Sequence, residues 1–372
     1  MIERKFWKPS ITSQFRVCPV PFHMDTYRGC TYGCLFCFAR DFIQFSRRNS
    51  EHKTQSYIEG NDPRGLERWI NRIFAKEYDY NKAEEVAFKE RIPLKIGATA
   101  DPFPLCERDE HITYDVLKIL QKIDYPVQIS TKNPEIFLEY ADEFKGNNLV
   151  LNVSISFFDD TLARKIETGA IPTSRRLSAI RQLTDKGFNT FIRVQPFVLP
   201  YTYDNAEIIV KSIADSGAFG FQTEGLKLRV VMPQNEKEIY SKIGDILGID
   251  ILNDFKRNGI IEGGDRVYNN DDKSKMLEKF DILAKRYGLK FYNADNFIDS
   301  KYGCGCECCG TSVLHDYKLW NGCSRARIFP INNVSNELGK CFVNFTRSQT
   351  NKNRTIQEVC DICFEPKQDT LF

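Results

Sequence analysis

The feature that most constrains the fold is an alternation of two kinds of segment between residues 90 and 225. Short runs typical of β-strands are separated by helix-length stretches whose apolar residues recur every three or four positions. Such alternation is typical of parallel sheets. Six units predict an α/β fold, a partial (βα)6 TIM-like barrel with its helices outside. The strand-like runs are 21–27, 93–99, 125–131, 149–156, 188–197 and 218–225, and the helical stretches are 111–123, 134–144, 174–187 and 205–217.

The chain divides into three expected regions. Its 372 residues exceed the usual size of one domain but suit a barrel with an appendage. We place the barrel in 1–225 and a helical continuation of it in 226–300, which ends near a short strand-like run at 289–293. Glycine and cysteine then become frequent. Residues 301–372 are therefore expected to form a small Cys-rich metal-binding region.

Composition and charge indicate where the protein is located and which partners it can bind. The N-terminus has no apolar signal-peptide core, and no apolar run approaches the length of a membrane-spanning helix. We therefore expect a cytoplasmic protein with no membrane partner. The net charge is only +2, but residues 301–354 hold eight Lys and Arg against three Asp and Glu. This segment is either a solvated face or a patch that contacts a polyanion such as nucleic acid.

Polar side chains end the predicted strands. In barrels of parallel strands, chemistry gathers at the carboxyl ends of the strands and in the loops after them. Any one of these side chains could instead cap a helix or a turn. The residues expected to face this one mouth are Thr99, Asp101, Thr131, Lys132, Ser154, Ser156, Gln195 and Glu224.

The cysteines point to metal chemistry. Clustered thiols in a cytoplasmic chain favour metal binding or catalysis over disulfides. Cys30, Cys34 and Cys37 share the loop after the first predicted strand, whereas His23 lies on that strand, so a four-ligand zinc site is not favoured. A [4Fe–4S] cluster held by three cysteines leaves one iron open to a small molecule. Three thiols therefore predict a reactive site.

The C-x3-C-x2-C pattern, with Phe36 directly before the last cysteine, resembles that of the radical S-adenosylmethionine (SAM) superfamily. The resemblance implies that Cys30, Cys34 and Cys37 bind a [4Fe–4S] cluster whose open iron is chelated by SAM. Reduction of such a cluster cleaves SAM to a 5′-deoxyadenosyl radical, which abstracts hydrogen from a substrate. It also implies an external electron donor of flavodoxin or ferredoxin type.

Four segments in order narrow the resemblance to the spore photoproduct lyase-like branch. They are MDTYRGCTYGCLFCFAR (24–40), GATADPFPLCE (97–107), ISTKNP (129–134) and the run over 153–188 that begins VSIS. One position departs from the branch. Spore photoproduct lyase has a hydrogen-returning cysteine where this chain has Ala98, and Cys106 lies several residues further on. The architecture is therefore expected to carry over, whereas thymine-dimer repair is in doubt.

The resemblance also implies roles for residues at the strand ends. It places Thr99 and Asp101 at the SAM amine. Lys132 and Ser154 are placed near the SAM carboxylate and ribose, for which an ammonium and a hydroxyl are suited. It leaves Glu167 and Arg175 as either an ion pair of the barrel or SAM contacts. The cofactor-binding residues expected in this way are Thr99, Asp101, Lys132, Ser154 and Gln195.

A second group of cysteines lies near the C-terminus. Four of its members fall within six residues, which buried free thiols would not explain. The group predicts a second metal site, either an auxiliary iron–sulfur cluster or zinc. Its candidate ligands are Cys304, Cys306, Cys308, Cys309, Cys323, Cys341, Cys360 and Cys363.

These features predict an enzyme that cleaves SAM reductively and abstracts hydrogen from a nucleic acid or nucleotide. A maturase that modifies a peptide or protein with the help of an auxiliary iron–sulfur cluster is the alternative. A metal-stabilised binding module without catalysis is a third hypothesis, and it predicts no 5′-deoxyadenosine from SAM.

Overall fold

The computed structural model describes most of the chain. The described residues are 2–12, 15, 17–39, 58–75, 82–146, 148–295, 302–303, 308–323, 325 and 333–335. None of the helices in these ranges is long and apolar enough to cross a membrane.

The largest element of the fold is an eight-stranded sheet in the order β14-β10-β9-β8-β7-β6-β3-β2. Edge strand β2 pairs antiparallel with β3, and the other strands pair in parallel. Within the described sheet β3 and β14 do not pair, so the barrel is open, as predicted. The strands are β2 (Ser10–Ile11), β3 (Phe22–Met24), β6 (Leu94–Ile96), β7 (Val127–Thr131), β8 (Leu149–Ser154), β9 (Asn189–Phe197), β10 (Gly220–Gly225) and β14 (Lys290–Asn293).

One strand extends the sheet beyond the six predicted units. The run at 289–293 was expected within a helical continuation, but β14 pairs in parallel with β10 from Gly220 to Thr223. The helix before it, α13 (Asn270–Arg286), packs Phe280 against both Phe221 and Phe291. Helix α13 and β14 thus add a seventh parallel strand to the sheet.

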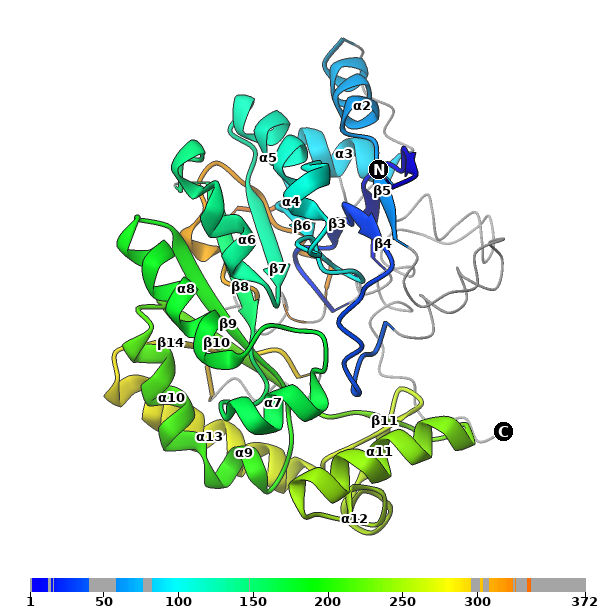
Figure 1. Ribbon diagram of the computed structural model, residues 1–372, viewed down its shortest axis with the longest axis vertical. Helices are drawn as coiled ribbons and strands as arrows, with labels where there is room; N and C mark the ends of the chain where they lie inside the picture. Colours follow the sequence, from blue (N-terminus) through cyan, green and yellow to red (C-terminus); the bar gives the residue numbers. More distant parts are fainter. Residues whose placement is uncertain are drawn as a thin grey trace.

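Helices cover the outside of the sheet, as Figure 1 shows for α5, α6, α8 and α10. The four predicted helices are present, with ends that differ by one or two residues, and the second of them breaks at Tyr140. Helices α11, α12 and α13 lie in 226–300, which was expected to be helical, and the other helices were not predicted. The remaining elements are α2 (Pro63–Ala75), α3 (Ala83–Lys89), α4 (Glu107–Glu110), α5 (Ile112–Lys122), α6 (Pro134–Glu139), η2 (Ala141–Glu143), α7 (Asp160–Ile166), α8 (Thr173–Asp185), α9 (Tyr201–Asp204), α10 (Ala206–Asp215), α11 (Gln234–Leu247), α12 (Ile251–Asn258) and η3 (Thr311–Val313).

Two small sheets were also not predicted. One joins β1 (Arg4–Lys5), β5 (Glu59–Asn61) and β4 (Tyr27–Arg28), and it places β4 directly before the cysteine loop. The other joins β11 (Leu228–Arg229), β13 (Asp265–Val267) and β12 (Ile260–Glu262). Strands of two or three residues are too short for a clear alternation pattern in the sequence.

The two faces of the main sheet differ. Alternate residues such as Leu94, Ile96 and Ile192 point outward into the main core beneath the helices. The opposite face is partly apolar, where Val150 and Phe191 pack with residues of the segment 308–319. The rest of this inner face is polar. Residues of the segment 308–319 therefore cover part of the inside of the barrel.

Candidate functional site

The loop that follows β4 carries the three predicted cluster ligands. Cys34 is 8% exposed, and Cys30 and Cys37 are half-buried. Burial raises the pKa of Cys30 to about 11 and that of Cys34 to about 12, and the three thiols are close enough for their charges to interact. Among the described residues, no three His, Cys, Asp or Glu side chains are grouped to hold one metal ion.

This loop is fixed to two other parts of the barrel. The backbone N–H of Leu35 donates to the carbonyl of Ile166 at 2.9 Å, and that of Gly169 donates to the carbonyl of Tyr32 at 2.7 Å. The hydroxyl of Tyr32 donates to the carbonyl of Phe103 at 2.7 Å. The loop after β6 and the α7–α8 connection therefore hold the loop that carries the thiols.

A buried carboxylate fixes the chain just ahead of the loop. Glu107 is fully buried and accepts hydrogen bonds from the hydroxyl of Tyr27 and from the backbone N–H groups of Thr113 and Tyr114. Burial raises the pKa of Glu107, although these donors oppose the shift. Glu107 thus ties β4 to the start of α5. Sequence reasoning gave it no role.

Asp25, directly after β3, organises the loop after β6. Its carboxylate accepts from the backbone N–H of Ala98 at 2.7 Å, from that of Thr99 at 3.1 Å and from the Thr99 hydroxyl. Thr99 therefore lies beside Asp25, and its hydroxyl is bonded to that carboxylate. Asp25 was missed because the predicted strand run 21–27 extends past it, whereas β3 ends at Met24.

Asp101 links this loop to the next strand. Its two carboxylate oxygens accept from the Thr131 hydroxyl at 2.8 Å, from the backbone N–H of Phe103 at 3.0 Å and from that of Lys132 at 2.6 Å. Burial raises the pKa of Asp101, and the hydrogen bonds counteract part of the shift. The side chain also lies near Cys30, whose pKa its charge raises. Asp101 and Lys132 are thus brought to the thiol loop.

Lys132, Glu167 and Arg176 form a buried triad beside Cys34. The ammonium of Lys132 contacts one oxygen of Glu167, and Arg176 Nη1 lies 2.6 Å from the other. Burial alone would raise the pKa of Glu167, but the charges of Arg176 and Lys132 lower it below its usual value. Lys132 also lies 5.3 Å from the centre of the Phe36 ring. The triad places a fixed positive charge next to the loop.

Of the two alternatives for Glu167 and Arg175, the ion pair between them is wrong. Arg175 lies on the exposed side of α8 and pairs with Glu135, with Nε 2.7 Å from Oε1. Consecutive residues of a helix point in directions about 100° apart, so Arg176 is the one that faces Glu167. The sequence alone did not show which arginine faces inward.

Ser154 and Gln195 lie on neighbouring strands, but their contacts differ. The carbonyl of Ser154 accepts from Arg176 at 2.9 Å, which connects it to the triad. Gln195 belongs to a second polar network, in which its amide oxygen accepts from Arg193 at 2.7 Å and its amide nitrogen contacts Glu224. Burial raises the pKa of Glu224, against the effect of the neighbouring Lys227. Arg193 was also missed.

Only part of the second cysteine group is described. Cys304, Cys306, Cys341, Cys360 and Cys363 lie outside the described residues. Cys323 is buried and its thiol donates to the carbonyl of Trp320 at 3.5 Å. Cys308 and Cys309 are neighbours on the inner face, and the hydrogen bond between their thiols lowers the pKa of Cys308.

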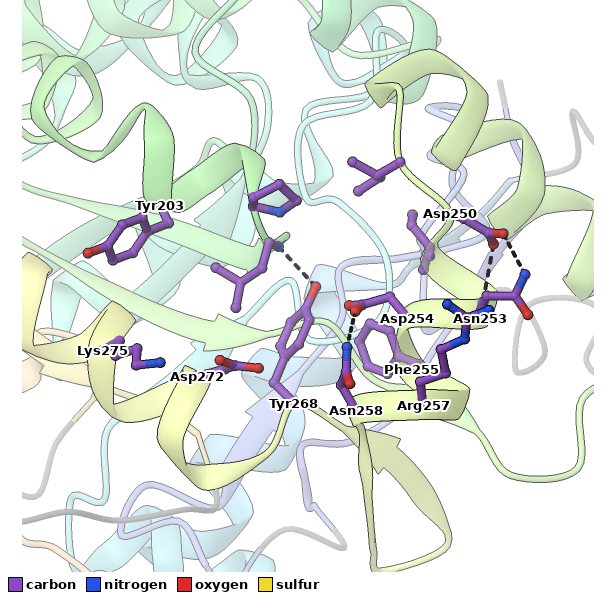
Figure 2. Close-up of a pocket in the computed structure, with 14 residues that line it drawn as sticks. Tyr203, Asp250, Asn253, Asp254, Phe255, Arg257, Asn258, Tyr268, Asp272 and Lys275 are labelled. Atoms are coloured by element: carbon purple, nitrogen blue, oxygen red, sulfur yellow. Dashed lines mark hydrogen bonds between the residues drawn. The ribbon is translucent and has the colours of Figure 1, made fainter.

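A separate pocket of about 580 Å³ lies at the edge of the molecule, between α9, α12 and α13 (Figure 2). The hydroxyl of Tyr268 accepts from the backbone N–H of Leu199 there, and Asp250 caps α12 by accepting from the N–H of Asn253. These polar groups serve the local fold. None of the predicted site residues lines this pocket, so the candidate site remains at the carboxyl ends of the strands.

A comparison with protein families identifies the superfamily of the chain. The model of the radical SAM superfamily matches residues 24–213, just over half of the chain. The chain belongs to the radical SAM superfamily. The matched segment includes the three thiols of the loop, Asp101, Lys132, Ser154 and Gln195. Radical SAM proteins are enzymes that use a [4Fe–4S] cluster, SAM and an electron donor, as the sequence predicted.

Relatives of this radical SAM protein include uncharacterized proteins of Mycobacterium bovis and Mycobacterium tuberculosis, which are 26% identical over 220 residues. That match covers 57% of this chain and only 60% of theirs. An uncharacterized protein of Methanocaldococcus jannaschii is 22% identical over 249 residues, which cover 64% of this chain and 86% of the relative.

Solved structures of spore photoproduct lyase share the radical SAM fold of this chain. The lyase complexed with a dinucleoside spore photoproduct has a TM-score of 0.52 at 13% identity, and the match covers 77% of this chain and 81% of the lyase. A lyase mutant with bound AdoMet and the same dinucleoside has a TM-score of 0.51 at 13% identity, covering 76% and 80%. This likeness in fold agrees with the sequence resemblance to the lyase-like branch.

Proposed function

We propose that the protein cleaves SAM reductively at a [4Fe–4S] cluster bound by Cys30, Cys34 and Cys37, and that the radical formed abstracts hydrogen from a nucleic acid or nucleotide. The observation that carries this proposal is the arrangement of three interacting thiols on one fixed loop, next to the buried cation of Lys132. The donor set fits the cluster, because thiolates bound to different irons of a cluster need not converge on one ion.

In this proposal Lys132 attracts the carboxylate of SAM. Glu167 and Arg176 fix the position of its ammonium, and Asp101 fixes its backbone. The hydroxyl of Ser154 is assigned to the ribose, and Thr99 and Asp101 to the amine. Gln195 is assigned to the same cofactor from the adjacent polar network. The cluster, when bound and reduced, supplies the electron that breaks a carbon–sulfur bond of SAM.

The nucleic acid part of the proposal rests on the sequence. The segment 301–354 has eight basic and three acidic residues, and the motifs resemble those of a lyase whose solved structure holds a dinucleoside. Thymine-dimer repair is not proposed. Ala98 replaces the hydrogen-returning cysteine, and Cys106 packs beside Tyr27 and Ile112 in a cluster of its own. We therefore propose hydrogen abstraction from the substrate, without the return of a hydrogen by a cysteine at this position.

Binding measurements on the anaerobically reconstituted chain test this substrate class. Fluorescence anisotropy with single-stranded DNA and RNA oligonucleotides is followed between 50 and 200 mM salt. We expect affinity to fall steeply, because binding to phosphates releases counterions. Binding that is absent, or that does not change with salt, contradicts the nucleic acid part and leaves SAM cleavage as a separate question.

The second candidate is a maturase that acts on a peptide or protein with an auxiliary cluster. The observation that favours it is the pair of thiols, Cys308 and Cys309, on the inner face of the barrel. The second metal site is proposed for the C-terminal cysteines already named, with iron–sulfur and zinc as the two forms. Transfer of deuterium from a labelled peptide into 5′-deoxyadenosine would support the maturase, whereas transfer from a labelled oligonucleotide would support the first candidate.

A further inference from the structure

One arginine of strand β9 lies inside the barrel. Its neighbours in the chain, Ile192 and Val194, belong to the main core beneath the helices, so the side chain of Arg193 points to the inner face. Arg193 is half-buried there. In the sheet it is paired in register with Ser154 on β8 and with Gln222 on β10. It therefore lies one strand away from the residue assigned to the ribose of SAM.

Neutral groups hold the guanidinium of Arg193 in place. Nη1 donates to the Ser130 hydroxyl at 3.0 Å, and Nη2 donates to the amide oxygen of Gln195 at 2.7 Å. Nε donates at 2.8 Å to the amide oxygen of Gln222, in the orientation that satisfies both ends of that amide. A guanidinium has five N–H groups. Its position is thus fixed by three of them, and two remain without an acceptor among the described residues.

The charge of Arg193 is not balanced by a carboxylate. Within the described ranges it forms no ion pair, because the nearby acids are paired with other bases. The carboxylate of Glu224 contacts Lys227, and that of Asp295 lies 3.5 Å from Lys273. A partly enclosed cation without an anionic partner is unfavourable. A bound anion would supply that partner.

The position of Arg193 is suitable for a substrate. On one side, Ser154 is the residue assigned to the SAM ribose. On the other side, the amide of Gln222 also donates to the carbonyl of Cys308, which belongs to the segment that covers part of the inside of the barrel. In the proposed function, hydrogen leaves the substrate next to the ribose. A group held by Arg193 would lie between that place and the covering segment.

We propose that Arg193 binds a phosphate group of the substrate on the inner face of the barrel. The proposal rests on the proposed function, whose substrate is a nucleic acid or nucleotide, and it names the residue that recognises the phosphate. Arginine suits this role because its planar guanidinium offers parallel N–H groups to phosphate oxygens. A free nucleotide and a nucleic acid strand both carry this group, and the measurements below separate the two sources.

Fluorescence anisotropy with labelled single-stranded DNA and RNA of mixed sequence tests binding to a strand. Arg193→Met should weaken the affinity about ten- to a hundred-fold, since a hydrogen bond between charged groups is lost. The dependence of log affinity on log salt should also become less steep by about 0.7, the value for one phosphate contact on a single strand. Arg286→Met is the matched control, because Arg286 pairs with Glu207 at the surface, and it should change neither quantity.

Calorimetric titration with each common nucleoside 5′-monophosphate and with its nucleoside tests binding to a free nucleotide. If the phosphate comes from a free nucleotide, one monophosphate should bind the unaltered chain about ten- to a hundred-fold more tightly than its nucleoside. Arg193→Met should remove this difference, whereas Arg286→Met should preserve it.

Arg193→Lys keeps the test decisive if the methionine variant does not fold, which iron content and thermal unfolding would show. Lysine retains the charge but not the planar pair of donors. The salt dependence should therefore stay as in the unaltered chain, while the affinity for the phosphate ligand falls.

Three results would overturn the proposal. Equal binding of these probes by the unaltered chain and the Arg193 variants would contradict the role of Arg193 and leave the proposed substrate class standing. A loss of affinity for SAM alone would assign Arg193 to the cofactor. An unaltered chain that binds none of the probes would contradict the substrate class itself, and the role of Arg193 with it, while SAM cleavage is measured separately.

Discussion

Two lysines near the inside of the barrel differ in what neutralises them. The ammonium of Lys132, after β7, contacts buried Glu167, which Arg176 also holds. That of Lys95, on the neighbouring strand β6, faces Cys18 and has no carboxylate partner among the described residues. The first cation is balanced by the protein itself. The second has a thiol as its hydrogen-bond partner, so the two lysines differ in the chemistry of the group that faces them.

The largest effect on stability is expected when the carboxylate that balances Lys132 is removed. Glu167→Ala leaves Arg176 and Lys132 buried without their carboxylate. Removing one partner of a buried ion pair typically costs about 3–5 kcal/mol of unfolding free energy. Chemical denaturation of the unaltered chain and the variant measures it.

Glu135→Ala is the matched control. The pair of Glu135 with Arg175 lies at the surface, where such pairs contribute less than about 1 kcal/mol. Equal losses of stability in the Glu167 and Glu135 variants would show that the buried triad has no special role in the fold.

The second prediction separates the two lysines by function. Lys132→Met should raise the KM for SAM roughly tenfold or more, because a charge-assisted hydrogen bond to the SAM carboxylate is lost. Lys95→Met should leave this KM unchanged. Steady-state formation of 5′-deoxyadenosine at varied SAM concentrations measures both, with iron content checked first. A similar rise in both variants would contradict the separate roles.

The smallest effect is a pH dependence of stability from Glu167. Its pKa in the folded protein lies below the ordinary value of 4.5. Its contribution to stability is therefore present above about pH 4.5 and is lost as the pH falls through the lower folded value. A shift of one unit corresponds to about 1.4 kcal/mol. Glu167→Gln should flatten this acid-side loss in denaturation curves at several pH values, and an unchanged slope would count against the assignment.

Much of the barrel could be predicted from the sequence, because short strand-like runs alternate with amphipathic helices. Asp101 and Lys132 were found in the same way, since each lies within two residues of the end of such a run. The partner of Glu167 could not be found, because helix rotation decides between Arg175 and Arg176. Strand β14 was missed as part of the sheet because only its pairing with β10 reveals it.

The surroundings of Cys18 show the limit of sequence reasoning more clearly. Cys18 has no cysteine neighbour in the chain, and Lys95 appears within an ordinary strand pattern. They are brought together with Cys308 and Cys309 by contacts between the two ends of the chain. No local pattern encodes such contacts, whereas the loop with Cys30, Cys34 and Cys37 is complete within eight residues.

The most direct test of the central claim is the reductive cleavage of SAM by the full chain under anaerobic conditions. The unaltered protein, loaded with iron and sulfide and reduced with dithionite, should form 5′-deoxyadenosine, and Cys34→Ala should form none. Formation of 5′-deoxyadenosine by the Cys34 variant, or its absence from the iron-loaded unaltered protein, would contradict the claim.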